Sequence, residues 1–379
     1  MSVVARFTGM RGFDGSWVLV PGNRDGRAET EMISMMQAAV VSDSGGVNFA
    51  EIERPSEPRP GWVLLRVAYC GICGSDLHFL GSPLAPAGLV MGHELTGIVD
   101  SVGAGVSALS EGDRVVVLPA ERCSPGDEQC PSCAEGATQR CHRQQSTSIG
   151  IVIPGGFAEY VEVPASSCFV LSDESSLQVA ALCEPLAVAL HAMGASRFQP
   201  GMDVAVIGAG PIGLLTIAAL RHLGAGEVGV SEPSPYRANL AASLGATTVV
   251  DRATRLSTTM AKSPEIVFEC AGRSGTPGEA IGLVRPGGEV ILAGVADPAE
   301  MLKISSIIWV VKEVSVQGVI AYTTEEFGKA VELIESVEFD PSLVISEIRP
   351  LSRAGESFAE LMGPNEQAKI LLSVDANEN

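Results

Sequence analysis

Two different patterns of hydrophobic positions divide the chain. From about residue 36, short apolar runs of the strand type lie between Gly, Pro and Ser residues, as in WVLLRVAYC (62–70) and DRVVVLP (113–119). Short strands with turn residues between them predict a small β-barrel with long loops. Near residue 175 apolar residues begin to recur every three or four positions, which predicts a helix in SSLQVAALCEPLAVALHAMGA (175–195).

Strand and helix patterns then alternate along the chain. The apolar strands DVAVIGA (203–209) and EVGVSEP (227–233) are each followed by a helical pattern, over 211–223 and 235–244. This alternation is typical of a parallel sheet with crossover helices. AKILLSV (368–374), near the end of the chain, has the strand pattern of the first half again.

The fold class predicted from these patterns is α/β, with a β-barrel domain and a doubly wound parallel sheet. The barrel domain is expected over 35–190 plus 325–379, and the parallel sheet over 191–324. Residues 1–34 mix Gly, Arg and Asp without periodicity, so we expect a poorly ordered N-terminal extension.

Charge and hydrophobicity exclude several classes of protein. The net charge of −20 argues against a nucleic-acid partner and against binding to an anionic membrane. VAVIGAGPIGLLTIAAL (204–220) approaches the length of a transmembrane helix, but the Gly and Pro residues in its first half favour a strand, a turn and a helix. The N-terminus has no basic patch before an apolar core, so we expect a cytoplasmic protein.

The turn within that stretch has the spacing of a nucleotide-binding loop. Gly208, Gly210 and Gly213 form G-x-G-x-x-G, with Pro211 and Ile212 between the last two glycines. The motif follows an apolar strand and opens a helix, which is the context in which it binds a pyrophosphate. Glycines let the backbone approach the phosphates, and the helix N-terminus offers free N–H groups.

The acidic residue after the next strand indicates which nucleotide is bound. Glu232 lies 24 residues after Gly208, where a carboxylate accepts the ribose hydroxyls of NAD and repels the 2′-phosphate of NADP. Arg237 lies close by and weakens that discrimination. The alternative is an ordinary glycine turn followed by a solvated glutamate. The sequence therefore favours NAD.

Cysteines form the first candidate metal site. Cys130, Cys133 and Cys141 have the spacing C-x2-C-x7-C, and zinc in a structural site takes four ligands. The fourth ligand is either Cys123 or Asp127, and thiolate chemistry favours Cys123. The alternative is a chance cluster of unligated cysteines. The chain has nine cysteines, an odd number that argues against a disulfide framework: Cys70, Cys73, Cys123, Cys130, Cys133, Cys141, Cys168, Cys183 and Cys270.

A second group of metal-ligand residues is spread along the chain. Cys73 lies in CGICGSDLH (70–78), His93 and Glu94 in MGHELTG (91–97), and Glu184 in CEPLAVALHA (183–192). The Cys-x-x-Cys pair could be a redox couple, but such a couple stands at a helix N-terminus in a small α/β fold, and here strands precede it.

From about residue 36 to its end, the chain resembles the zinc-dependent medium-chain dehydrogenases. The matching motifs, besides the cysteine loop, are CGICGSDLH, GHELTG, DRVVV, GGFAEYV, EPLAVALHA, GAGPIG and KEVSVQG. Glu184 stands where alcohol dehydrogenases have a second cysteine, and this is similar to the sorbitol, threonine and glucose dehydrogenase branch.

The resemblance implies a fold and a set of metal ligands. It implies a GroES-like barrel and a Rossmann domain, with catalysis in the cleft between them. Cys73, His93 and Glu94 match the ligands of the catalytic zinc, and Glu184 is implied as a ligand that acts directly or through water. Cys70 is then not a ligand, and we expect it to pack in the core.

The resemblance also implies a reaction. Zinc lowers the pKa of a bound hydroxyl and nicotinamide accepts the hydride, so we expect oxidation of a secondary alcohol in a polyol, a cyclitol or a sugar-derived substrate. Ser75 and His78 match the family's proton relay, and Asp76 matches the carboxylate that orients the histidine ligand His93.

Other features of the family are expectations for this chain too. The family forms homodimers and homotetramers through the edge of the Rossmann sheet, here near 285–320.

Two alternative functions remain. One is a zinc-free reductase of enones or quinones that uses NADPH, although such enzymes lack these cysteine and histidine motifs. The other is a non-catalytic nucleotide-binding protein.

Overall fold

The computed structural model describes residues 9–11, 17–19, 34–123, 128–296, 301–363 and 365–374. The described residues divide into two units, one within residues 1–33 and one within residues 34–379. In the first unit, β1 (Gly9–Arg11) pairs with β2 (Trp17–Leu19) in antiparallel orientation. Ser34, the last residue of the expected poorly ordered extension, belongs to the second unit, and, apart from β1 and β2, the other residues of that extension lie outside the described residues.

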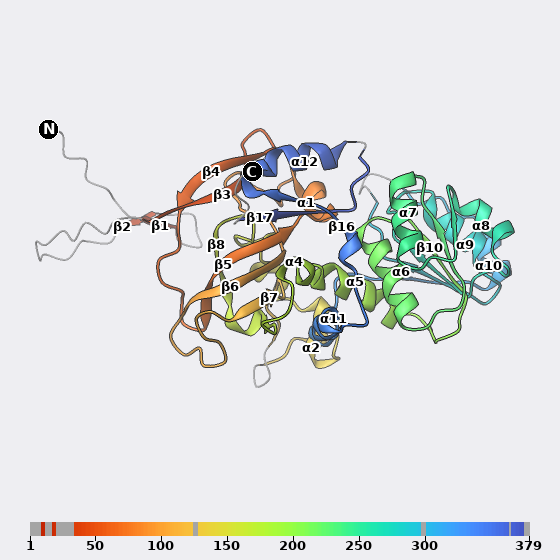
Figure 1. Cartoon of the computed structure of the whole chain (residues 1–379), viewed down its shortest axis with the longest axis horizontal. Helices are drawn as coiled ribbons and strands as arrows, with labels where there is room; N and C mark the ends of the chain where they lie inside the picture. Colours follow the sequence, from red (N-terminus) through yellow and green to blue (C-terminus); the bar gives the residue numbers. More distant parts are fainter. Residues whose placement is uncertain are drawn as a thin grey trace, which may run out of the picture. The chain divides into compact units, whose positions relative to one another are not determined.

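The first large sheet has seven strands and includes the last described strand of the chain. Its order is β16-β17-β5-β6-β7-β9, and β8 pairs with β5. The last strand, β17, runs antiparallel to β5, so residues about 300 positions apart lie side by side (Figure 1). The strands are β5 (Trp62–Gly71), β6 (Glu94–Val102), β7 (Arg114–Val117), β8 (Tyr160–Pro164), β9 (Cys168–Val170), β16 (Ile345–Pro350) and β17 (Lys369–Ser373).

β5, which pairs with β17, β6 and β8, has one face buried in an apolar core. Val63, Leu65 and Val67 of β5 pack in one apolar core with residues of β6, β8 and β17. Burying each such side chain contributes roughly 1.5–3 kcal/mol, which holds the long antiparallel strands together. A hairpin of β3 (Met35–Val41) and β4 (Val47–Glu53) packs against the same core.

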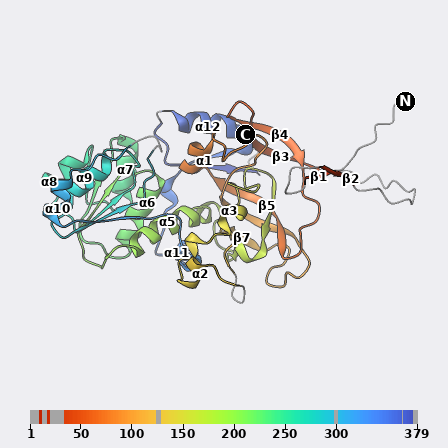
Figure 2. The ribbon, with the colours of Figure 1, turned by 180° about the vertical axis from the view of Figure 1, so that it is seen from behind.

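The second sheet has six strands, all parallel, in the order β12-β11-β10-β13-β14-β15. Alternate residues of β10 face opposite sides. Val204 and Val206 pack with α6 (Pro211–His222), whereas Ala205 and Ile207 pack with α8 (Ala253–Thr259) and α9 (Thr276–Leu283). A parallel sheet needs helices on both faces, and Figure 2 shows them around it. The strands are β10 (Val204–Ile207), β11 (Val228–Ser231), β12 (Thr248–Val250), β13 (Ile266–Glu269), β14 (Glu289–Leu292) and β15 (Ser315–Gly318).

The helices confirm the predicted α/β fold class, with differences at their ends. The pattern over 175–195 forms two helices rather than one, and the helix at Ser306–Lys312 was not predicted, because its apolar run IIWVV looks like a strand. The helices are α1 (Gly74–Phe79), α2 (Pro131–Ala134), α3 (Gln144–Thr147), α4 (Leu177–Ala180), α5 (Cys183–Gly194), α6 (Pro211–His222), α7 (Pro235–Ser243), α8 (Ala253–Thr259), α9 (Thr276–Leu283), α10 (Ser306–Lys312), α11 (Thr324–Glu335) and α12 (Ala354–Met362). Short 3₁₀ helices cover Thr138–Arg140, Ala165–Ser167, Ser342–Val344 and Leu351–Arg353.

The apolar stretch 204–220 forms β10 and α6, as its glycines predicted. None of the helices within the described part of the chain is long and apolar enough to cross a membrane.

Candidate metal centres and nucleotide loop

The four cysteines between residues 123 and 141 come together in one buried cluster. Cys130 caps α2, Cys133 lies within it, and Cys141 follows the 3₁₀ turn. The four Sγ atoms lie within 4.8 Å of one another, and those of Cys123 and Cys141 are 3.7 Å apart. A tetrahedral zinc with Zn–S bonds of about 2.3 Å has S–S edges of about 3.8 Å, so the cluster fits zinc. Asp127, the other candidate ligand, lies outside the described residues.

Hydrogen bonds favour negative charge on one of these sulfurs. Backbone N–H groups of His142 and Cys133 lower the pKa of Cys130 to about 6, whereas burial raises the pKa of Cys133 to about 12. Crowded thiols cannot all ionise in an apolar setting without a cation. A metal ion would remove this conflict by binding all four as thiolates.

Cys73, His93 and Glu94 form the second cluster, because β5 and β6 pair in antiparallel orientation. Gly71, at the end of β5, lies opposite Glu94, at the start of β6. Cys73 follows two residues later as the cap of α1. One ligand atom from each of Cys73, His93 and Glu94 lies within 4.8 Å of the others. Cys70, on β5, is fully buried in the core as expected.

The surroundings of His93 favour positive charge at this position. Its Nδ1 lies 3.4 Å from Asp76 Oδ1, and its Nε2 lies 3.3 Å from Ser75 Oγ. Burial opposes a charge on the imidazole, but Asp76 and Cys73 outweigh it and raise the pKa of His93 well above its ordinary value. The negative groups that favour a proton on the imidazole would also favour a metal cation in place of that proton, with an imidazole nitrogen as its ligand. His78, on the last turn of α1, is exposed.

One carboxylate oxygen of Glu94 accepts a hydrogen bond, and the other has no hydrogen-bond partner among the described residues. Its Oε1 accepts a 2.6 Å hydrogen bond from Lys369 Nζ, which also donates to the carbonyl oxygen of Ile72 at 2.8 Å. Its Oε2 is buried without a hydrogen-bond partner among the described residues. A Cβ at Gly71 would stand 2.1 Å from that atom, so only glycine leaves room there. An orphaned carboxylate oxygen beside Cys73 and His93 fits a metal ion.

Lys369 is a buried residue of this site that the sequence pattern did not predict. It is fully buried at the start of β17 and interacts with Glu94 across 275 residues of sequence. Burial lowers the pKa of Lys369, but the charge and hydrogen bond of Glu94, together with the negative groups Cys73 and Glu184, outweigh burial and raise that pKa above its ordinary value. The only signal in the sequence was a lysine at the start of the apolar run KILLSV (369–374).

Glu184 lies near this cluster but has a different partner. Its side chain is buried in the first turn of α5, and its Oε1 accepts a 2.8 Å hydrogen bond from the hydroxyl of Tyr322. It is not one of the three residues whose ligand atoms lie within 4.8 Å of one another. Burial raises the pKa of Glu184 to about 7; the charge of Glu94 adds to this effect, and His93 and Tyr322 oppose it.

The glycine loop has the geometry that a phosphate ligand needs. Gly208 has a φ of +93°, and a Cβ there would come within 2.8 Å of Ala271. A Cβ at Gly213 would stand 2.0 Å from the Gly208 carbonyl oxygen, so both positions need glycine for packing. Gly210, the cap of α6, faces open space, with no heavy atom of the described residues within 4 Å of a Cβ. A pyrophosphate fits there, at the helix N-terminus.

Glu232 binds protein groups with both of its oxygens. Oε2 accepts from the backbone N–H of Ala209 at 2.8 Å, and Oε1 accepts from Ser234 N–H and from the Arg237 guanidinium, each at 2.9 Å. Arg237 also donates to the carbonyl oxygen of Asn365. The carboxylate therefore lies beside the glycine loop.

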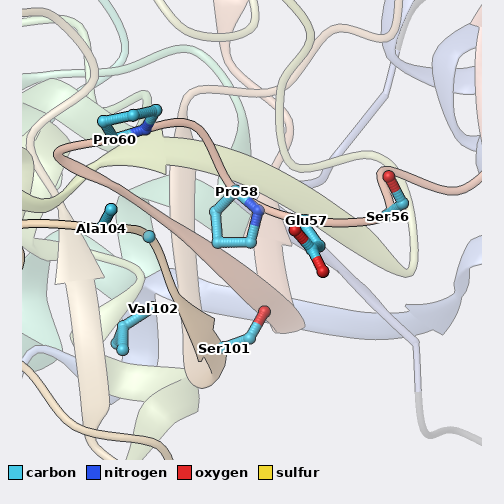
Figure 3. A pocket seen from close by; sticks show the side chains of 8 residues that line it. Ser56, Glu57, Pro58, Pro60, Ser101, Val102 and Ala104 are labelled. Atoms are coloured by element: carbon cyan, nitrogen blue, oxygen red, sulfur yellow. The ribbon is translucent and has the colours of Figure 1, made fainter.

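A separate surface pocket of about 530 Å³ contains none of these candidate residues (Figure 3). It lies where the segment before β5 meets the end of β6, and Glu57 is its only charged lining residue. We therefore locate the candidate active site at the second cluster instead.

A parallel sheet with a phosphate loop, joined to a Cys–His–Glu cluster, is typical of metal-dependent dehydrogenases. The family model "Alcohol dehydrogenase GroES-like domain" matches residues 59–173, and "Zinc-binding dehydrogenase" matches residues 211–336.

Individual relatives agree with these matches. The 2-dehydro-3-deoxy-L-galactonate 5-dehydrogenase of Pseudoalteromonas atlantica is 32% identical over 85% of this chain and 94% of its own. The (R,R)-butanediol dehydrogenase of Bacillus subtilis is 33% identical over 89% of this chain and 99% of its own. A structure from Sinorhizobium meliloti 1021, described as a zinc-binding dehydrogenase bound to NADP, has a TM-score of 0.81 at 31% identity and covers 90% of this chain and 99% of its own.

The chain belongs to the zinc-containing medium-chain alcohol dehydrogenase family, and it is a zinc-dependent enzyme that oxidises alcohols with a nicotinamide nucleotide.

Proposed function

We propose that this enzyme transfers a hydride between the secondary alcohol of a polyol, cyclitol or sugar-derived substrate and NAD. The observation that carries the proposal is the orphaned Glu94 Oε2 beside Cys73 and His93, with the carboxyl group of Glu184 nearby. Acidic groups suit a substrate with several hydroxyls, because each carboxylate accepts hydrogen bonds from them. The names of the galactonate and butanediol relatives, both enzymes of hydroxylated substrates, support the same class.

Cys73, His93 and Glu94 would hold the catalytic zinc, and Cys123, Cys130, Cys133 and Cys141 the structural one. When bound, the catalytic zinc supplies a Lewis acid that lowers the pKa of a substrate hydroxyl.

The residues of the chain orient the site and move the proton. Asp76 Oδ1 faces His93 Nδ1, which keeps the proton on that nitrogen and leaves Nε2 free as a ligand atom. Ser75 Oγ lies beside the same imidazole, and its hydroxyl accepts the substrate's proton as it donates its own proton onward to His78. His78 lies three residues further along α1, on the same helix face, and is exposed. It passes the proton to solvent, because imidazole titrates near neutral pH.

NAD is the proposed cofactor because the carboxylate of Glu232 lies at the end of β11 beside the glycine loop. A 2′-phosphate at that position would meet like charge. Arg237 binds the same carboxylate and reduces this repulsion, so NADP is expected to bind more weakly rather than not at all. The Sinorhizobium relative was solved with NADP bound, so the activity of this enzyme with NAD should be compared with its activity with NADP.

We also propose a homodimer, or a homotetramer built from such dimers, that forms through the edge of the parallel sheet. Ile307, Val310 and Val311 on α10 are 70–74% exposed, and β15 is the last strand of the sheet. Contiguous exposed apolar side chains beside an open strand edge favour association. Light scattering should give at least twice the mass of one chain, and Val310→Asp should shift the protein toward monomer.

A substrate panel with a metal assay tests the main proposal. We expect reduction of NAD with polyols, cyclitols or sugar acids, and about two zinc ions per chain by elemental mass spectrometry. Activity confined to simple primary alcohols would contradict the substrate class. Protein without zinc that still turned over would contradict the assignment of the metal ligands.

A further inference from the structure

Tyr322 connects the candidate active site to a distant part of the chain. Its side chain is 2% exposed, and its hydroxyl donates the 2.8 Å hydrogen bond to Glu184 Oε1. The preceding residue, Ala321, has a φ of +51°, a conformation that residues other than glycine seldom adopt. Such strain persists where the surrounding structure holds it and is often found at functional positions.

The segment after Tyr322 is tied to the helix that carries Glu184. Thr323 and Glu326 form a capping box at the start of α11, with bonds of 2.8 Å and 3.1 Å. Glu326 also lies 2.9 Å from Nδ1 of His191, which is on α5 together with Glu184. These contacts fix the direction of the Tyr322 side chain relative to α5.

The four-cysteine loop holds the other side of this segment. The backbone N–H of Thr324 donates to Thr138 Oγ1 at 3.1 Å, and these residues are 186 positions apart in sequence. Thr138 lies between Cys133 and Cys141 along the chain. Both views show α2 of this loop beside α11 (Figures 1 and 2).

Arg122 is a second residue of the loop region that lies near Tyr322. It directly precedes Cys123, and its guanidinium is within electrostatic range of Tyr322 and of the thiols of Cys133 and Cys141. Its Nε and Nη1 are buried and have no hydrogen-bond partner among the described residues. A buried guanidinium needs compensating negative charge. Four thiolates gathered on a divalent ion carry a net charge of about −2, which supplies it.

We propose that Tyr322 is a positioning residue for Glu184, and that the metal-bound four-cysteine loop holds Tyr322 in place through Thr138 and Arg122. This inference rests on the proposed function, because it assigns Glu184 to the catalytic site. The structural metal would then act on catalysis as well as on stability. A loop that served stability alone would not need contacts to the segment that orients an active-site carboxylate.

A double-mutant cycle on turnover tests the first link. Tyr322→Phe removes only the hydroxyl and should lower kcat about 10-fold, with the KM for NAD unchanged and both zinc ions retained. In a Glu184→Ala background the same change should have no further effect on kcat. Tyr69→Phe is the control, since the Tyr69 hydroxyl bonds to Gln178 and not to Glu184. Equal losses from Tyr322→Phe in the two backgrounds would overturn the proposal.

Hydrogen exchange tests the second link without relying on activity. Thr138→Val and Arg122→Met should each speed amide exchange across residues 320–326 and lower kcat. Arg122→Lys, which keeps the positive charge, should leave the exchange rate and kcat close to those of the wild-type protein. Exchange that rose only within residues 128–141, with kcat unchanged, would show that Thr138 and Arg122 serve the loop alone and would overturn the proposal. If the wild-type protein oxidised no polyol, the proposed function would fail, whereas the exchange measurement would still decide whether the loop holds Tyr322.

Discussion

Replacing Lys369 by methionine removes a buried charge without changing the length of the side chain much. Lys369 and Glu94 are 1% and 0% exposed, with Nζ and Oε1 2.6 Å apart. Lys369 Nζ also donates to the carbonyl oxygen of Ile72. In the metal-free protein, Lys369→Met leaves the Glu94 carboxylate buried and without its counter-charge.

The cost follows from this burial. Removing one partner of a buried ion pair typically destabilises a protein by about 3–5 kcal/mol, because the other charge remains uncompensated. An unfolding entropy of about 2.1 cal/mol/K per residue over a chain of 379 residues gives about 0.8 kcal/mol/K. We therefore expect the Tm of the metal-free protein to fall by about 4–6 °C.

Thermal and urea unfolding of chelator-treated protein at pH 7 measure this loss. The matched control is Lys329→Met, because Lys329 forms an exposed pair with Glu325 at 2.7 Å. That change should cost less than about 0.5 kcal/mol. Adding Glu94→Gln to Lys369→Met should recover most of the loss, since an amide needs no counter-charge. A loss below about 1 kcal/mol, or one equal to that of the control, would refute the reasoning.

Three further predictions concern the metal, the pH dependence of stability and the cofactor. Gly71→Ala would place a Cβ 2.1 Å from Glu94 Oε2, so elemental analysis should find one zinc fewer per chain, while Gly74→Ala, which meets no described atom within 4 Å, should keep both. The pKa of Glu184 is about 7 in the folded metal-free protein and 4.5 ordinarily, so between these values the folded state binds more protons than the unfolded state. Its contribution to stability is therefore present below about pH 4.5 and lost as the pH rises through 7. Denaturant titrations at several pH values should show that Glu184→Gln flattens this fall in the free energy of unfolding with pH. Glu232→Ser should reduce the ratio of kcat/KM for NAD to that for NADP by at least about 10-fold, and an unchanged ratio would exclude Glu232 from cofactor choice.

Much of the candidate site could be predicted because its chemistry is encoded over short distances. The loop from Gly208 to Gly213 combines a strand, a turn and a helix start within a few residues, so its spacing alone indicates a phosphate site. The dense cysteines similarly predict a metal cluster before any fold is known. The change from strand-like to alternating patterns likewise predicted the two kinds of sheet, because the periodicity of each element reflects which of its faces is buried.

Partners that come from distant strands and helices could not be predicted in this way. Lys369 meets Glu94 only because β17 pairs with β5 in a particular register, and no local pattern of either strand specifies that neighbour. Tyr322, which precedes α11, meets Glu184 of α5 across 138 residues of sequence because α11 packs against α5.

The sequence by itself therefore determined the residue types of both metal clusters and the local geometry of the four-cysteine loop and of the nucleotide loop, whereas the pairing of β5 with β6 brought Cys73, His93 and Glu94 together. The tertiary structure decided which buried charge compensates which, because burial removes water and makes each ionised group depend on the one partner that packing brings within reach.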